Sequence, residues 1–213
     1  MSEVVASLPQ LARGMATTFA ISACAMLLAI CGGFLVGVAR SYAPRAVDAP
    51  LLAAIELVRG VPLIVMMFFA FFGLPQLGVH TSSNAAAVAA LGVYAAALGS
   101  EIVRGAIASI PRGQSEAAAS LGLGTMQTLR LVILPQALRR MLPPFVGLFA
   151  LIVESSSLSA LIGVRDVLQA ARLAVERDPG AAFALYASVL VAYFCVNYPV
   201  SAASRRLERA LVR

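Results

Sequence analysis

Long runs of apolar residues, separated by short polar stretches, dominate the pattern of this 213-residue chain. A helix needs about 20 apolar residues to cross the hydrocarbon core of a bilayer. Five runs approach or exceed that length and predict transmembrane helices at residues 15–38, 51–73, 85–100, 144–164 and 180–204. The first and last runs carry no charged residue, and the third is the shortest and is rich in alanine.

Composition points to the same class of protein. Hydrophobic residues make up 61% of the chain and charged residues 12%, with a mean hydropathy of +0.90. A soluble fold needs more polar residues than this to cover its surface, so the bilayer must be the solvent for much of the chain. A cleaved signal peptide is the alternative for the first run, but its apolar core would be shorter. We therefore expect an all-α membrane protein, with residues 1–213 forming a single transmembrane domain.

The arginines predict the orientation of the five spans, which place the two termini on opposite sides of the membrane. With the N-terminus outside, eleven arginines lie in inside segments and four in outside segments, and Arg59 lies within a span. The positive-inside rule then places the C-terminus and the loop at about 105–142 in the cytoplasm, and residues 165–178 in an outer loop. The chain has no lysine, which excludes a P-loop. The arginines are scattered and tryptophan is absent, so we expect no nucleic-acid partner.

The predicted cytoplasmic loop has the pattern of two short helices joined by a turn. Pro111 and Gly113 break the incoming helix, and residues 114–121 form a short helix with Glu116 in its first turn. Gly122 and Gly124 end that helix. Thr125 is then the expected N-cap of a second helix that runs to residue 134. Composition alone leaves two alternatives open: the pair docks on a soluble partner through its alanine face, or it lies flat on the lipid headgroups.

The spacing within this loop resembles the signature of ABC importer permeases. The loop carries Glu116-Ala117-Ala118, then Gly122, then Val-Ile-Leu-Pro ending at Pro135, with Val132 where the family usually has isoleucine. Further segments resemble the polar amino-acid uptake permeases, at residues 55–63, 101–105, 110–114, 132–139, 157–158 and 162–164. The resemblance covers about residues 17–211.

The resemblance implies a type I importer-like fold and a division of labour between subunits in a bacterial inner membrane. Two permeases, identical or related, would enclose the pathway, with two ATPase subunits below and an extracytoplasmic solute-binding protein delivering an amino acid. ATP and Mg would bind the ATPase, so no cofactor is expected on this chain. The loop helix would rest in a cleft of the ATPase and couple its closure to the spans. The residues expected to carry this coupling are Gln114, Glu116, Ala117, Ala118, Gly122 and Leu123.

Two groups of polar residues lie inside the predicted spans. Each is expected to have a structural or functional role, because inserting an ionisable side chain at the bilayer centre costs about 2.5–3.5 kcal/mol of free energy. Glu56 and Arg59 are three residues apart and are therefore neighbours on one helix face. They form either a self-paired structural couple or a polar lining of the pathway. Pro62 follows closely, so we expect the helix to break there, and freed backbone groups beside a cavity can serve a ligand site.

Glu154 belongs to the second group of polar residues within the predicted spans. It lies within the fourth predicted span beside Ser155, Ser156 and Ser157. The subfamily usually has lysine at this position, so this chain replaces a cation with a carboxylate. One interpretation is an inter-helix hydrogen bond or an ion pair with Arg59. The other places Glu154, with Ser155 and Ser157, along the substrate pathway, where the carboxylate favours a cationic group such as an α-ammonium or a basic side chain.

Competing functions are an intramembrane enzyme and a stand-alone channel or carrier. An enzyme would need a nucleophile with its base, or a set of metal ligands, and the sequence offers neither a catalytic nor a metal-binding motif. The lone histidine, His80, lies outside the predicted spans. A channel would leave the helical loop without a use. The solute, whether an amino acid or a derivative of one, and the choice between homodimer and heterodimer are left open by the sequence.

Overall fold

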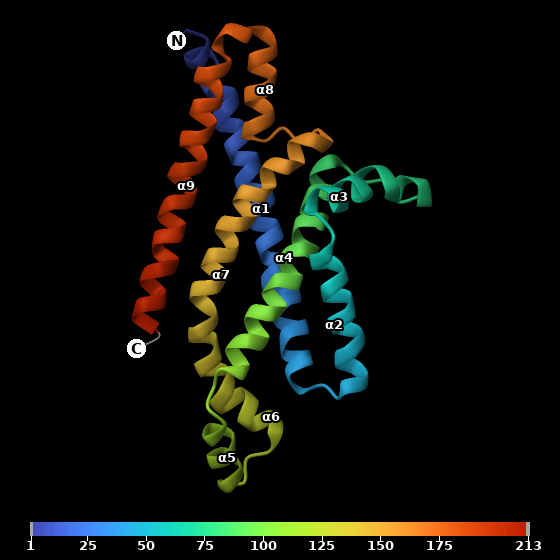
Figure 1. The fold of residues 1–213 in the computed structure, drawn as a ribbon, viewed down its shortest axis with the longest axis vertical. Coiled ribbons are helices and arrows are strands. Elements are labelled where there is room, and N and C mark those ends of the chain that lie inside the picture. The colour runs from blue at the N-terminus through green and yellow to red at the C-terminus, as the bar shows by residue number, and fades with distance from the viewer. Residues whose placement is uncertain (1, 212–213) are drawn as a thin grey trace.

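The computed structural model describes residues 2–211. Long helices form a bundle, and shorter helices lie at both of its ends (Figure 1). Four helices form most of the bundle: α1 (Ser2–Tyr42), α4 (Ser83–Ala108), α7 (Leu134–Ser156) and α9 (Ala182–Leu211). The shorter helices are α2 (Arg45–Gly60), α3 (Leu63–Phe68), α5 (Arg112–Ser120), α6 (Thr125–Thr128) and α8 (Val167–Arg177). The two chain ends lie toward opposite ends of the bundle. Arg213, which was counted among the inside arginines, lies outside the described residues.

Four helical stretches in this part of the chain are long and apolar enough to cross a membrane: Val4–Tyr42, Ser83–Ala108, Thr125–Ile162 and Pro179–Leu211. A fifth span results if Arg45–Gly60 and Leu63–Leu77 are counted as one broken pair. The predicted all-α class with about five spans is therefore confirmed. The helices run well past the predicted apolar runs, because charged residues such as Arg40 and Arg104 interrupt the apolar pattern without interrupting the helix.

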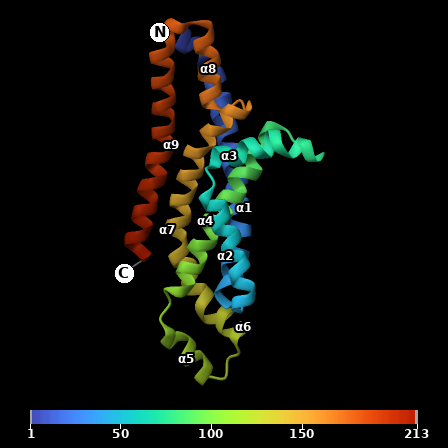
Figure 2. The ribbon, with the colours of Figure 1, turned by 45° about the vertical axis from the view of Figure 1, so that its right-hand side comes forward.

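The break predicted at Pro62 is confirmed, but it turns the chain much further than a kink within a straight span would. Val61 and Pro62 both adopt extended backbone angles, as expected for a residue before proline and for proline itself. The two halves meet at 97°. Helix α3 and the π-helical and 3₁₀ segments after it, Phe69–Gly73 and Leu74–Leu77, project sideways from the bundle (Figures 1 and 2). The predicted span 51–73 is therefore present only as a broken pair of helices.

Helices α1 and α4 approach each other so closely that side chains are excluded from the contact. A Cβ atom placed on Gly33 would lie 2.9 Å from the backbone carbon of Gly99, and one on Gly37 would lie 2.6 Å from the carbonyl oxygen of Ser100. Buried alanines, among them Ala29 and Ala95, continue the contact. Small residues are the usual means of packing helices in a bilayer, where the hydrophobic effect no longer drives association.

A cluster of charged side chains joins the same two helices near the C-terminal end of α1. The guanidinium group of Arg40, whose side chain is 4% exposed, donates to Asp48 at 2.8 Å and also to Glu101. Arg104 binds the other carboxylate oxygen of Glu101 at 2.9 Å. Glu101 and Arg104, three residues apart on α4, thus pair with each other, and Arg40 and Asp48 extend the cluster to α1 and α2.

Residues 165–178 were expected to lie in an outer loop between two spans; most of them form helix α8, which is not among the helices long enough to span a membrane. Its buried residues follow a helical period, at Val167, Ala170, Ala171 and Ala174. They pack against Leu11 of α1 and against Leu185 and Val189 of α9. The period was present in the sequence, but the charged residues between its members hid it from a search for apolar runs.

Asp166 begins α8 and is fully buried. One carboxylate oxygen, Oδ1, accepts a hydrogen bond from the backbone N–H of Gln169 at 2.8 Å, and Oδ2 has no partner among the described residues. Burial raises the pKa of Asp166 from 3.8 to about 6, although backbone N–H groups at the helix start partly offset this.

We predict that Gly37→Ala lowers the thermal unfolding midpoint of the purified protein, because the added methyl group meets the backbone of α4. Overpacking of this kind costs about 1–3 kcal/mol. The control is Gly105→Ala on α4, where a Cβ meets nothing within 4 Å. In a helix interior that change should be neutral or slightly stabilising. Equal midpoints for the two variants would contradict the close contact.

We also predict that Asp166 gives the protein a component of stability that falls as pH rises. The folded carboxyl has the higher pKa, so it binds its proton more tightly than the unfolded chain does. Its contribution is complete below about pH 4 and is lost as pH rises to about 6. Asp166→Asn keeps an oxygen for the N-cap but does not titrate. The difference in unfolding midpoint between wild type and variant, measured from pH 4 to 7, should therefore change in this window; a constant difference would contradict the prediction.

Candidate functional site

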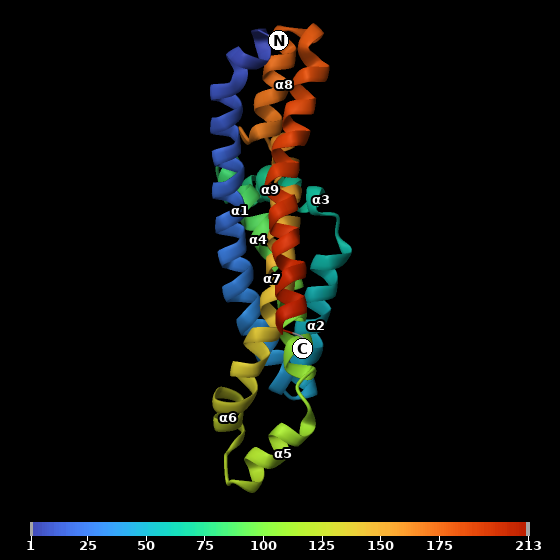
Figure 3. The ribbon, with the colours of Figure 1, turned by 90° about the vertical axis from the view of Figure 1, so that its left-hand side faces the viewer.

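The two short helices α5 and α6 form a hairpin that extends beyond the end of the bundle (Figure 3). Its first helix ends at Gly122, which adopts a φ of 79°. The N–H groups of Gly122 and Leu123 donate back to the carbonyls of Ala119 and Ala118, at 2.9 and 3.1 Å. This pair of bonds is the Schellman arrangement that ends many helices. The predicted end of the helix is therefore confirmed, and the constraint on Gly122 is conformational, since a Cβ there would meet nothing within 4 Å.

Two details of the predicted hairpin are wrong. Helix α5 begins at Arg112, two residues before the predicted start, so Glu116 lies in its second turn. Thr125 is not an N-cap; Gly124 takes that place, and its N–H donates to the side chain of Gln127 at 3.0 Å.

The second helix of the hairpin does not stop at residue 134 but continues into α7. A π-helical segment, Leu129–Ile133, joins α6 to α7. Within it the N–H of Leu134 bonds the carbonyl of Leu129. Pro135 then follows directly after this wider turn, as the second residue of α7. The wider turn lets the helix continue through Pro135, which was predicted to mark its end.

The hairpin is fastened to the bundle at its base and at mid-height. Arg140 of α7 donates to the carbonyl oxygen of Ser109 at 2.6 Å and to its hydroxyl at 2.9 Å. Further out, Gln136 donates to the side chain of Gln114 at 3.1 Å. Gln136 therefore ties α5 itself to α7, and Arg140 ties the end of α4, just before α5, to the same helix.

The predicted coupling residues divide between the outside and the inside of the hairpin. Gln114, Glu116 and Ala117 are exposed on α5, whereas Ala118 is 3% exposed and packs within this chain. Leu123 is half-buried. Leu121 and Met126 were not predicted as coupling residues, yet their side chains are 81% and 57% exposed on the hairpin. Exposed large apolar side chains beside the helix end mark a surface that a partner can cover.

Glu56 and Arg59 form an ion pair with each other, with 3.0 Å between Arg59 Nη1 and Glu56 Oε1. Both side chains are exposed on α2, and their placement on one helix face is confirmed. Because Arg59 is taken up by this pair, the alternative in which it binds Glu154 is not realised within residues 2–211.

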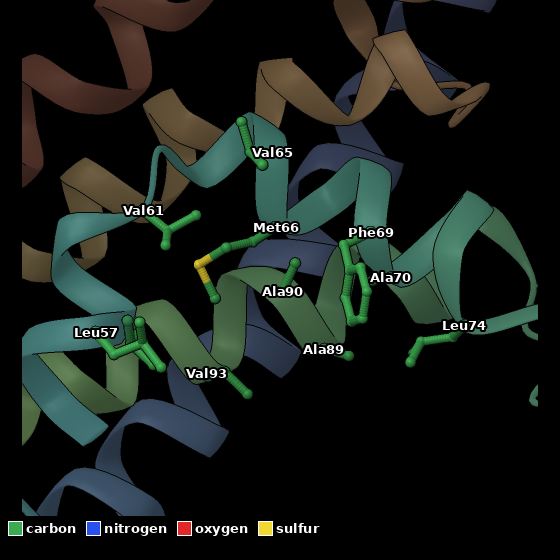
Figure 4. Close-up of a pocket in the computed structure, with 11 residues that line it drawn as sticks. Leu57, Val61, Val65, Met66, Phe69, Ala70, Leu74, Ala89, Ala90 and Val93 are labelled. Carbon is green, nitrogen blue, oxygen red and sulfur yellow. The ribbon is translucent and has the colours of Figure 1, made fainter. Parts of the chain in front are cut away.

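A cavity of about 470 Å³ lies where α2 turns into α3 and both cover α4 (Figure 4). Every residue around it is apolar, including Leu57 and Val61 before the break, Met66 and Phe69 after it, and Val93 of α4. A zwitterion would lose its hydration here without gaining a hydrogen bond, at a cost of several kcal/mol. The break at Pro62 therefore does adjoin a cavity, but not one that suits a polar solute.

Glu154 projects from the last turn of α7 and is exposed. Its side chain makes no hydrogen bond or ion pair with the rest of the described chain. The hydroxyl of Ser157 donates to its backbone carbonyl at 2.8 Å, and Ser155 and Ser157 are half-buried beside it. The structure thus groups Glu154, Ser155 and Ser157 at one helix end, and no described hydrogen bond joins them to Glu56 or Arg59.

Comparison with known proteins decides the family. Residues 29–213 match the binding-protein-dependent transport system inner membrane components. The chain belongs to this family. The predicted resemblance to ABC importer permeases is thereby confirmed, and the family is a transport subunit rather than an enzyme.

Whole-length relatives support the same assignment. The permease is 37% identical over 198 residues to the "Probable glutamine ABC transporter permease protein GlnP" of Bacillus subtilis (strain 168), covering 92% of the permease and 90% of the relative. It is 32% identical over 212 residues to the "Glutamine transport system permease protein GlnP" of Escherichia coli (strain K12), covering 99% and 96%.

Solved structures share the fold. One described as an amino acid ABC transporter with histidines superposes with a TM-score of 0.89 at 26% identity, covering 97% of the permease and 96% of that chain. The inward-facing methionine transporter MetNI superposes at 0.81 and 23% identity, covering 97% and 98%, which shows the fold alone. The type I importer fold is therefore confirmed.

Proposed function

We propose that this permease forms, with a second copy or a sister permease, the translocation pathway of an ATP-driven importer for a polar amino acid. The observation that carries the proposal is the hairpin, which hydrogen bonds tie to α7, on a chain that matches glutamine permeases over 92% and 99% of its length. A separate ATPase subunit dimer binds ATP and Mg and hydrolyses ATP, and an extracytoplasmic solute-binding protein delivers the amino acid.

The orientation follows from the arginines and the hairpin together. The N-terminus lies outside and the C-terminus in the cytoplasm of a bacterial inner membrane. This orientation puts α5 on the side where the ATPase works and α8 on the side where the solute-binding protein docks. The ATPase then meets the cytoplasmic end of the bundle, and the solute-binding protein meets the outer end.

Coupling depends on the exposed face of α5 and on its attachment. The side chains of Gln114, Glu116, Ala117 and Leu121 contact the ATPase, and Ala118, Gly122 and Leu123 hold the helix in place from within the hairpin. A ligand or partner shifts an equilibrium only through its different affinity for the two states. The contact of α5 with the open and closed ATPase dimers supplies that difference.

Glu154 provides the electrostatic selectivity of the pathway. Its carboxylate is exposed on the surface of a single permease, where a second permease facing it would enclose it with Ser155 and Ser157. A carboxylate in such a site attracts the α-ammonium of any amino acid, or the side chain of a basic one. The Glu56–Arg59 pair lies along the same pathway as a neutral couple.

Gly122→Val should abolish amino-acid uptake and amino-acid-stimulated ATP hydrolysis in reconstituted vesicles while the protein still inserts. A β-branched residue cannot adopt a φ of 79° without strain, so the end of α5 must shift. The matched control is Gly113→Ala, a position in the same helix with no positive φ and nothing within 4 Å of its Cβ. The control should retain uptake and stimulation. Full transport by Gly122→Val would remove the coupling role.

Glu154→Gln should lower the uptake of lysine, arginine or histidine by about tenfold or more, since a charge-assisted hydrogen bond is worth about 1.5–3 kcal/mol. Transport in proteoliposomes measures this directly. Glu176→Gln removes an exposed carboxylate of α8 and should leave uptake unchanged. Unchanged uptake by Glu154→Gln for every amino acid tested would count against the proposed role of the carboxylate.

A further inference from the structure

A groove of about 410 Å³ runs between α1 and α8, at the opposite end of the bundle from the hairpin. Three arginines border it: Arg13 of α1, Arg165 just before α8, and Arg177 at the end of α8. We call it the arginine groove. Its lining contains no acidic residue.

The groove exists because α1 and α8 approach most closely at Gly14 and the side chains beside that contact are small. A Cβ atom on Gly14 would lie 2.6 Å from the carbonyl oxygen of Asp166, so the start of α8 rests directly on α1. Gly14 and Ala170 leave space beside this contact, and the longer arginine side chains surround it. Arg177 is held across the groove by its hydrogen bond to Gln10 at 3.2 Å.

No ion pair within residues 2–211 neutralises the three guanidinium groups. The ion pairs found in residues 2–211 involve Arg40, Arg59 and Arg104, and none involves an arginine of the groove. Of the carboxylates next to these arginines in the sequence, Asp166 is fully buried and caps α8, and Asp178 accepts a hydrogen bond from the backbone N–H of Gly180. Glu176 is exposed and forms no ion pair within residues 2–211. Cations gathered around a concave surface with no acid among them attract an anion, and the planar guanidinium groups of arginine suit phosphate oxygens.

The position of the groove along the bundle selects the source of that anion. The charge-free run of α1 starts at Met15, and the groove residues of α1 lie at positions 10 to 17, where that run begins. Seven residues of helix rise about 10 Å. The headgroup layers account for the difference between about 30 Å of hydrocarbon and about 40–45 Å of whole bilayer. The groove therefore spans the level of the lipid phosphates.

The opening of the groove also favours lipid. Its lining comes from two helices that lie side by side for several turns, as α1 and α8 do in Figures 1 and 3. A concavity between such helices is bordered along its length by their sides, so a lipid lying beside the bundle can reach it. We propose that the arginine groove binds the phosphate of a phospholipid headgroup in the leaflet on the N-terminal side of the permease.

The test is the binding of dioctanoyl phosphatidylglycerol to the delipidated permease–ATPase complex, followed by native mass spectrometry. The variant carries Arg13→Ala, Arg165→Ala and Arg177→Ala together. We expect its affinity for the lipid to fall about tenfold or more, as charge-assisted bonds are lost. Arg172→Ala is the matched control, because Arg172 is exposed on α8 and does not line the groove. The triple arginine-to-lysine variant guards against misfolding and should keep part of the affinity.

Four results would overturn the proposal: unchanged lipid binding in a folded alanine variant, an equal loss in Arg172→Ala, equal binding of dioctanoyl glycerol, which lacks phosphate, or binding of inorganic phosphate without binding of the lipid. A variant that binds lipid normally but binds an acidic solute-binding protein less well would assign the groove to that protein instead. Lipid binding is measured without transport, so its failure leaves the proposed function untouched.

Discussion

The backbone contact between α1 and α4 is the constraint on which the other elements depend. Two helices in a bilayer gain little from burying apolar surface against each other, so they need close packing or polar contacts to stay together. Gly33 and Gly37 supply the close packing, and the ion cluster around Arg40 supplies the polar contact at one end. Asp48 attaches α2 to that cluster, and Ser109, just after α4, anchors the hairpin. At the other end of α1, Gly14 receives α8.

Mechanical continuity links the hairpin to the polar end of α7. Helical structure runs without a gap from Thr125 to Ile162, and Glu154 lies near the end of this stretch. Gln136 ties α5 to this stretch, and Arg140 ties Ser109, at the end of α4, to it as well. Under the proposed function, a displacement of α5 by the ATPase would reach the serine-rich segment through continuous helix rather than through a chain of separate side-chain contacts.

The sequence predicted those features that depend on local chemistry. Charge-free runs marked the spans, Gly122 marked a helix end that needs a positive φ, and Pro62 marked a break. It could not predict features set by packing between distant segments. The 97° turn after Pro62, the burial of Ala118 and the passage of the helix through Pro135 all depend on neighbours that are remote in sequence. Helix α8 was detectable from its periodicity but not from hydropathy, and the separation of Glu154 from Arg59 required the fold.

The π-helical segment Leu129–Ile133 has a consequence for the length of the chain itself. Such a turn is equivalent to one residue inserted into an α-helix, and each residue of an α-helix advances the side chains by about 100°. Because the wider turn absorbs the extra residue, a one-residue deletion within the segment would restore a regular α-helix and leave Glu154 and its serines on nearly the same face relative to α5. A one-residue deletion in the α-helical stretch between this segment and Glu154 would instead rotate them by about 100°. The number of residues between the hairpin and the polar end of α7 can therefore change without turning that end only where the helix is already wide.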